Sequence, residues 1–193
     1  MERMFYGCFW KIALLLFTGF SLQLQAQNLP DPERFESAIL QFEALDRINP
    51  PPKDAIVLTG SSSIARWNEQ SHAALAPLTV IPRGFGGSIM NDVLHYLDRV
   101  ALTYEPRAIL IYEGDNDIVQ GVPVPVVLAT YKKVITRILD DFSETRIYLI
   151  SVKPSIARES LWSDMTLVNR VCAPSPNKKI RVLHRRCDTD VKR

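Results

Sequence analysis

Two hydrophobic patterns alternate along the middle of the chain. Short apolar runs rich in branched residues, which are typical of buried strands, occupy residues 55–59, 78–81, 108–112 and 146–152. Apolar residues at helical spacing occupy residues 31–48, 89–100 and 126–142. Strands that alternate with helices predict parallel βαβ units, so we expect an α/β domain whose sheet is covered on both faces.

The pattern breaks down towards the C-terminus. Residues 165–171 resemble the start of another helix, and the Ala-Pro-Ser-Pro segment at 173–176 interrupts it. The sequence that follows shows neither a strand nor a helix pattern, so we expect the last strand and helix of the fold to be missing. The fourth predicted strand, residues 146–152, would then be an unpaired sheet edge with an uncovered apolar face, which favours aggregation.

Composition fits one well-buried domain. The chain has 193 residues, of which 47% are hydrophobic and 23% charged. Its net charge of +2 is unevenly distributed, because residues 170–193 hold eight Lys and Arg against two Asp while the rest carries an acidic excess. Basic residues gathered in a terminal tail argue against nucleic acid as a partner.

The N-terminus is typical of an export signal. Arg3 and Lys11 precede an uncharged apolar run over residues 12–22, and Ala26 is a suitable residue before a cleavage site. We expect residues 1–26 to be a signal peptide and the protein to be secreted or periplasmic, without a membrane anchor after cleavage. An uncleaved anchor is the alternative, since Leu24 is large for its position.

We therefore divide the chain into three parts. The signal peptide is followed by one domain at residues 27–171 and by an aberrant basic tail at residues 172–193. The three cysteines, Cys8, Cys172 and Cys187, all lie outside the domain body or at its end, so neither a disulfide framework nor a zinc site is indicated.

Three short polar segments each follow a predicted strand. They are LTGSSS at residues 58–63, RGFGGS at 83–88 and YEGDND at 112–117. The carboxyl ends of parallel strands meet at one edge of a sheet, so these segments are expected to form one site. They offer a serine on a tight turn, glycine N–H groups and an asparagine amide, all of which are useful in acyl transfer.

Each segment also has other interpretations. The serines at residues 61–63 could cap the next helix. The glycines at residues 84–87 could form a phosphate cradle, although the third glycine of the dinucleotide fingerprint is missing, or a turn in which Ser88 is a helix cap. Residues 113–117 could bind a hard metal ion, donate a hydrogen bond through Asn116, or form a capped loop.

In this order, the three segments resemble the first three sequence blocks of the SGNH, or GDSL-like, serine hydrolases. The resemblance covers residues 54–171, and Ser61 stands where the family usually has the Asp of its name. It implies a three-layer, flavodoxin-like α/β sandwich around a parallel sheet. It also implies hydrolysis of small-molecule, carbohydrate or lipid esters through an acyl-enzyme, with no metal or cofactor. By the same resemblance Ser62 is the nucleophile, and the Ser62 N–H, the Gly87 N–H and the Asn116 amide form the oxyanion hole.

The family's last block, Asp-x-x-His, has no counterpart near the C-terminus. His184 and His72 lack an Asp three residues before them. Asp92 and His95 have the spacing, but they lie between the second and third segments and are expected to be surface residues of a helix. A serine hydroxyl without a base is a poor nucleophile, so we expect the chain to be nearly inactive.

Two other functions remain open. The chain could be a non-catalytic product of the same fold that binds a ligand near Ser62 and Asn116, or a nucleotide- or metal-binding domain that uses Asp115 and Asp117.

A frame change would explain the tail. Reading the codons of residues 183–191 from their second base permits an apolar strand followed by a loop, which resembles the fifth strand of the family. The hypothesis is that a one-base change close to residues 171–173 replaced the last strand and removed the Asp/His block. Sequencing the gene around these codons tests it.

Overall fold

A computed structural model describes residues 29–153, 155–172 and 179–183 of the chain. The expected signal peptide, His184 and most of the basic tail therefore lie outside the described residues. Among the helices within these ranges, none is long and apolar enough to cross a membrane.

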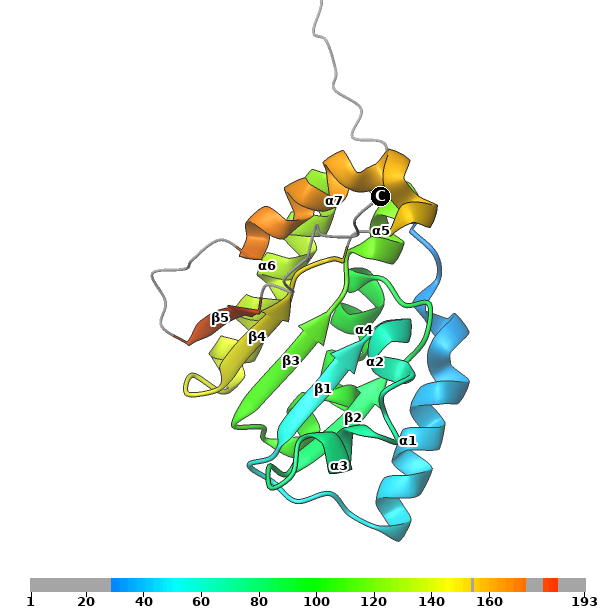
Figure 1. Cartoon of the computed structure of the whole chain (residues 1–193). Coiled ribbons are helices and arrows are strands. Elements are labelled where there is room, and N and C mark those ends of the chain that lie inside the picture. Colours follow the sequence, from blue (N-terminus) through cyan, green and yellow to red (C-terminus); the bar gives the residue numbers. More distant parts are fainter. Residues whose placement is uncertain (1–28, 154, 173–178, 184–193) are drawn as a thin grey trace, which may run out of the picture.

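The centre of the described structure is a five-stranded parallel sheet with the order β2-β1-β3-β4-β5 (Figure 1). The strands are β1 (Ile56–Gly60), β2 (Val80–Gly84), β3 (Ala108–Tyr112), β4 (Arg146–Ile150) and β5 (Ile180–Leu183). The α/β fold class predicted from the alternating pattern is confirmed.

Three of the helices match the predicted amphipathic segments. They are α1 (Glu36–Ile48), α4 (Met90–Val100) and α6 (Val124–Asp141). The remaining helical elements are short: η1 (Pro32–Phe35), α2 (Ser62–Ala65), α3 (Ser71–Ala74), η2 (Leu102–Tyr104), α5 (Asp115–Val119), η3 (Ile156–Leu161), α7 (Trp162–Val168) and η4 (Asn169–Cys172).

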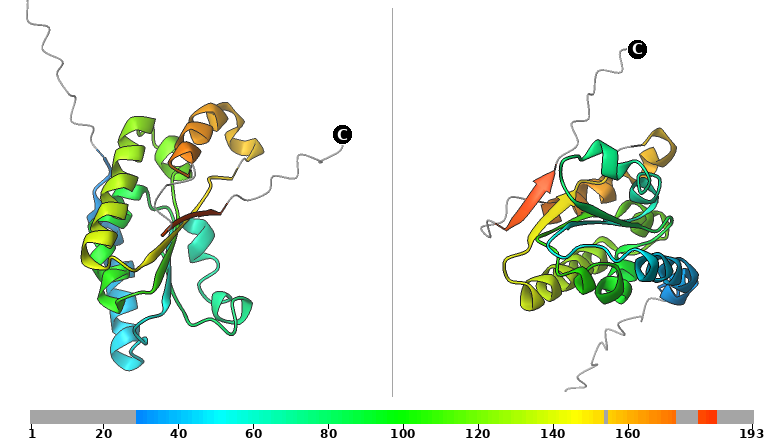
Figure 2. Two further views of the ribbon diagram at one scale, coloured as in Figure 1. Left: turned by 90° about the vertical axis from the view of Figure 1, so that its left-hand side faces the viewer. Right: turned by 90° about the horizontal axis from the view of Figure 1, so that it is seen from below.

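The two faces of the sheet are covered unequally. Helices α1, α4 and α6 lie together on one face, whereas α2 and α3 lie on the other (Figure 2). The larger core lies under the three long helices and includes the fully buried Tyr96, Ile109 and Tyr131. A smaller cluster of Leu58, Ile64, Val80 and Tyr112 lies under α2. The prediction of a sheet covered on both faces thus holds fully for one face only, since Tyr148 and Ile150 of β4 are half-buried.

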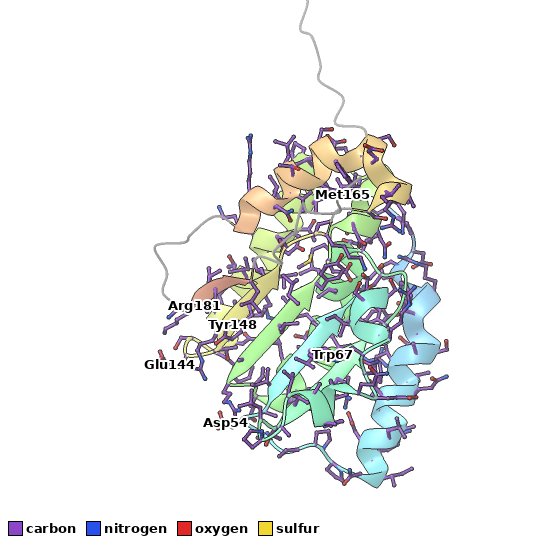
Figure 3. All side chains as sticks on the ribbon, viewed as in Figure 1. Asp54, Trp67, Glu144, Tyr148, Met165 and Arg181 are labelled. Atoms are coloured by element: carbon purple, nitrogen blue, oxygen red, sulfur yellow. The ribbon has the colours of Figure 1, made fainter. Side chains whose placement is uncertain are left out.

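The tail contributes a strand that sequence reasoning missed. β5 pairs with β4, with Tyr148 opposite Arg181 (Figure 3), and the Ile147 N–H donates to the Lys179 carbonyl. Ile180 packs against the larger core. The expectation that β4 is an unpaired sheet edge, and that no strand follows it, is wrong. Four residues in a strongly basic segment are enough to satisfy the backbone of β4, but they are too few to show a strand pattern.

The boundary of β2 also differs from the prediction. The strand begins at Val80, two residues later than expected, and continues through Pro82 and Arg83 to Gly84. Proline is tolerated here because β2 is an edge strand, where one side of the backbone needs no hydrogen bond from a neighbour. As a result the glycine segment begins directly at the carboxyl end of the strand.

Candidate active site

The register of the sheet brings the three segments to one edge. Gly60 at the end of β1 lies opposite Gly84 of β2 and Tyr112 of β3. The pairing continues beyond the strands, because the Ser61 N–H donates to the Tyr112 carbonyl at 3.1 Å and the Phe85 N–H donates to the Gly60 carbonyl at 2.9 Å. The predicted convergence of the segments at the carboxyl edge is therefore present in the backbone.

Ser62 is the first residue of α2, directly after a turn that only glycine can make. Gly60 has φ +127°, and a Cβ atom there would lie 2.2 Å from the carbonyl oxygen of Tyr112. This tight approach turns the chain sharply from β1 into α2 and leaves Ser62 half-buried at the sheet edge. Ser61 is fully buried, and its side chain makes no capping hydrogen bond to α2, so the capping interpretation is wrong for Ser61.

The glycine segment passes directly over Ser62. A Cβ atom on Gly86 would lie 3.8 Å from the Cα atom of Ser62, which shows how closely the two backbones approach. Gly87 has φ +92°, and a Cβ atom there would meet nothing within 4 Å. The backbone at Gly87 is thus exposed and in a left-handed conformation, which favours glycine.

Ser88 holds the glycine segment to the third segment and does not cap α4. Its hydroxyl donates to the Glu113 carboxylate, whereas the N-cap position of α4 is occupied by Ile89. The Ile89 N–H is satisfied by the carboxylate of Asp92 at 2.9 Å. The interpretation of Ser88 as a helix cap is therefore wrong, because a buried carboxylate competes successfully for its hydroxyl.

Asn116 completes the link between the segments. Its side-chain Nδ2 donates to the Ser88 carbonyl oxygen at 3.0 Å, one residue after Gly87. A carboxamide has two N–H donors, so this bond leaves one for another acceptor. Close contacts therefore run from Ser62 to Gly86, and from Ser88 to Asn116.

The carboxylates of the third segment accept hydrogen bonds from other groups of the protein. Asp117 accepts from the N–H groups of Met90 and Gly114 at 3.0 and 3.1 Å. Burial raises the pKa of Asp117 to about 6, and burial raises the pKa of Glu113 well above its ordinary value. Within the described ranges, no group of three or more His, Cys, Asp and Glu side chains has the arrangement of a metal site.

The two histidines among the described residues, His72 and His95, have partners or surroundings away from Ser62. His95 is exposed and lies 3.3 Å from the Glu33 carboxylate. Asp92 is fully buried and pairs with Arg34, so the expectation that both are surface residues is wrong for Asp92. The Asp92 carboxylate can be buried because it accepts a hydrogen bond from the Ile89 N–H at the N-terminus of its own helix. His72, on α3, lines a groove between α1 and β2, and Ser62 does not line this groove.

Lys153 and Arg158, two cationic residues from the segment after β4, lie at the same edge of the sheet. Neither was predicted from the sequence. The Lys153 Nζ donates to the Ser63 hydroxyl at 3.0 Å. Arg158 donates through Nη1 to Asp115 at 2.9 Å and through Nη2 to the Asn116 Oδ1 at 3.4 Å. The rule that polar residues after parallel strands meet at one edge also applies to β4, and applying it there would have drawn attention to both residues.

Comparison with family models found no match, and none of the curated proteins matches the chain. Solved structures do match. A GDSL-like lipase from Bacteroides thetaiotaomicron is 15% identical, with a TM-score of 0.64 over 76% of this chain and 77% of that one. A protein described as an acylhydrolase from Bacteroides fragilis is 16% identical, with a TM-score of 0.64 over 81% and 78%.

A psychrotrophic esterase from a Pseudoalteromonas species, in a structure inhibited by monoethylphosphonate, is 16% identical, with a TM-score of 0.54 over 69% and 78%. All three combine low identity with a similar fold. The chain therefore has the SGNH, or GDSL-like, hydrolase fold.

Proposed function

We propose that this chain is a carboxylic ester hydrolase of the SGNH type, with Ser62 as the nucleophile. The Ser62 N–H, the Gly87 N–H and the Asn116 carboxamide would form the oxyanion hole. The observation that carries the proposal is the series of contacts at the sheet edge, in which Gly86 lies against Ser62 and Asn116 donates to Ser88. The similar structures, named as lipases, acylhydrolases and esterases, support the same class of reaction.

The proposed reaction has two halves. The Ser62 oxygen attacks the ester carbonyl carbon and loses its proton to a base, while negative charge develops on the carbonyl oxygen opposite the three N–H donors. The alcohol then leaves with a proton, and water hydrolyses the acyl-serine in the same manner. Small-molecule, carbohydrate and lipid esters all satisfy this chemistry.

The proposed reaction needs a general base, and neither described histidine is identified as one. Of the described histidines, His95 contacts Glu33 and His72 lines a different groove. Loss of one member of a catalytic triad slows turnover on the order of 10⁴- to 10⁶-fold. We therefore propose that this chain hydrolyses esters very slowly unless a base is supplied.

The test uses the full chain and a fluorophosphonate probe, with imidazole in solution as the external base. We expect labelling at Ser62 whose rate increases with imidazole concentration and which is lost in Ser62→Ala. Ser63→Ala is the matched control, since Ser63 is the next residue of α2 and its hydroxyl is bonded to Lys153. Labelling that persists in Ser62→Ala would refute the assignment of the nucleophile.

The second candidate is a non-catalytic, ligand-binding protein of the same fold. It is favoured by the surroundings of His72 and His95, which leave Ser62 without a histidine partner from either. Hydrolysis of an activated ester by the full chain, reduced to the background rate in Ser62→Ala, would exclude this candidate. Binding of an ester without any Ser62-dependent turnover would favour it.

Export is part of the proposal. A basic start and a short apolar run before Ala26 support a cleaved signal peptide. Expression in a bacterium followed by cell fractionation and N-terminal sequencing tests it. We expect a periplasmic or secreted product that begins at Gln27, and a product that retains residue 1 would contradict cleavage.

A further inference from the structure

We propose that Arg158 is a positioning residue that fixes the orientation of the Asn116 carboxamide. The inference rests on the proposed function, since it assigns to Arg158 the task of aiming an oxyanion-hole donor. Arg158 lies in η3, more than forty residues after Asn116 and beyond β4, so only the fold brings the two together.

The two ends of the carboxamide have different partners. Arg158 Nη2 donates to the Asn116 Oδ1 at 3.4 Å, and the Asn116 Nδ2 donates to the Ser88 carbonyl at 3.0 Å. A carboxamide turned by half a rotation would place its NH₂ group against a guanidinium donor and its oxygen against a carbonyl oxygen. Both mismatches disfavour the rotated form, so Arg158 and Ser88 select one orientation, with the N–H donors towards the glycine segment.

Asp115 holds the guanidinium in place. Its Oδ2 accepts from Arg158 Nη1 at 2.9 Å, and its Oδ1 accepts from the Asn116 N–H at 2.9 Å. The Asp115 side chain is 10% exposed and that of Arg158 is 32% exposed, so the ion pair is partly shielded from water. One carboxylate therefore fixes both the backbone of Asn116 and the group that orients its side chain.

The backbone of η3 is shaped to deliver this side chain. Arg158 departs from helical geometry, with φ −127° and ψ 25°, inside an otherwise 3₁₀-helical segment. Its N–H still donates to the Ser155 carbonyl at 2.9 Å, and the same carbonyl accepts from the Trp162 ring nitrogen at 3.1 Å. The Ser155 carbonyl thus ties the kinked residue and the following Trp162 to the start of η3.

Replacing the forked guanidinium with lysine distinguishes a positioning role from a simple ion pair. Arg158 uses two different nitrogens for Asp115 and Asn116, whereas lysine is a point charge that cannot reproduce this fork. Arg158→Lys keeps a positive charge beside Asp115 and removes the second arm. We expect labelling of Ser62 by the fluorophosphonate probe, with imidazole present, to be roughly 10- to 100-fold slower in this variant.

A double-mutant cycle tests whether Arg158 acts through Asn116. Asn116→Ala is expected to slow labelling on the order of 10²- to 10³-fold. Adding Arg158→Lys to Asn116→Ala should slow it no further, because the group that Arg158 orients is gone. An undiminished effect of Arg158→Lys in the Asn116→Ala background would overturn the proposal, as would labelling of Arg158→Lys at the rate of the unmodified chain.

The matched control is Arg137→Lys on α6. Arg137 is also forked, with Nε bonded to Asp141 and Nη2 bonded to Asp98, and it is away from the candidate site. We expect this variant to be labelled at the unmodified rate. A slowing equal to that of Arg158→Lys would show a general effect of losing a forked arginine and would overturn the proposal.

A second readout does not depend on activity. The side-chain NH₂ signal of Asn116 in a ¹⁵N–¹H spectrum can be assigned by its loss in Asn116→Asp. We expect this signal to shift and broaden in Arg158→Lys and to be unchanged in Arg137→Lys, and an unchanged signal in both variants would overturn the positioning role. If the unmodified chain is not labelled at Ser62, the proposed function fails, whereas the NMR result still decides whether Arg158 orients Asn116.

Discussion

At the scale of single residues, the geometry of the candidate site depends on Gly60. Its φ of +127° turns the chain from β1 into α2, and a Cβ atom would lie 2.2 Å from the Tyr112 carbonyl oxygen. Gly121 also has a positive φ, +75°, but a Cβ atom there would meet nothing within 4 Å. Both positions therefore carry backbone strain for a residue with a side chain, but only Gly60 adds steric overlap. Comparing the two separates these effects.

We expect Gly60→Ala to be the more harmful of the two changes. Gly121→Ala should cost about 1–2 kcal/mol of unfolding free energy from strain alone. Gly60→Ala adds a clash with the backbone of β3, and we expect either a substantially larger loss or no folded protein. Urea unfolding followed by circular dichroism measures both. Equal losses in the two variants would contradict the close approach of Gly60 and Tyr112.

Asp117 gives the protein a pH dependence. Its pKa is raised from 3.8 to about 6 by burial, so the ionised form is disfavoured in the folded state. The raised pKa contributes stability that is fully present below about pH 4 and is lost as the pH rises through about 6. Two pKa units correspond to about 3 kcal/mol. The raised pKa of Glu113 acts in the same direction.

The prediction is that the protein is more stable at pH 5 than at pH 7. Asp117→Asn cannot ionise at this position, so the difference in unfolding free energy between the two pH values should be smaller in the variant. Urea titrations of both proteins at both pH values measure this difference. An unchanged pH dependence in Asp117→Asn would show that the Asp117 carboxyl is not buried as described.

At the scale of elements, β5 is the least expected feature. Ile180 packs against the larger core, whereas the neighbouring Arg181 is exposed. Successive residues of a strand point to opposite faces, so substitutions at the two positions should differ. We expect Ile180→Asn to lower the unfolding free energy by about 1–3 kcal/mol and Arg181→Asn to have an effect within about 0.5 kcal/mol.

Urea unfolding of both variants checks the prediction. Similar small effects at the two positions would indicate that this segment does not pair with β4.

Regular elements were predictable wherever the hydrophobic period runs over enough residues, as it does in α4 and α6. The length and boundary of β2 were not, because Pro82 and Gly84 are typical of loops and only an edge position permits them in a strand. β5 was missed because it has only four residues and lies in a basic segment, so it shows no strand pattern.

The same limit applies to the site. The segments that carry Ser62, Gly87 and Asn116 were predictable because each follows a recognisable strand, and the backbone contacts between these segments agree with that topology. The roles of the three residues rest on the resemblance to the family and stay a prediction. The rule for residues after parallel strands would have brought Arg158 to attention as a residue beyond β4. Its contact with Asn116 was not predictable, because that contact depends on a kink in η3 that local sequence does not reveal.

At the scale of the whole molecule, one face of the sheet is thinly covered. Helices α1, α4 and α6 cover one face, whereas α2 and α3 lie on the other (Figure 2). On that second face Tyr148 and Ile150 are half-buried. Leu183, on β5, is 42% exposed. Partly exposed apolar strands next to a short edge strand favour association.

We therefore expect the full-length chain to be poorly soluble and to unfold at a low temperature over a broad range. Differential scanning calorimetry and light scattering at several concentrations measure both properties. A sharp transition at high temperature from a monodisperse sample would contradict this expectation.

The central claim is that the Ser62 hydroxyl attacks an ester carbonyl carbon while the Gly87 N–H and the Asn116 carboxamide, from two other segments, donate to the carbonyl oxygen. The most direct measurement is a crystal structure of the full chain after reaction with a phosphonate. We predict a covalent bond from Ser62 Oγ to phosphorus, with the phosphoryl oxygen about 2.7–3.1 Å from the Gly87 nitrogen and the Asn116 Nδ2. A phosphonate attached to another residue, or to Ser62 with its oxygen turned to solvent, would contradict the claim.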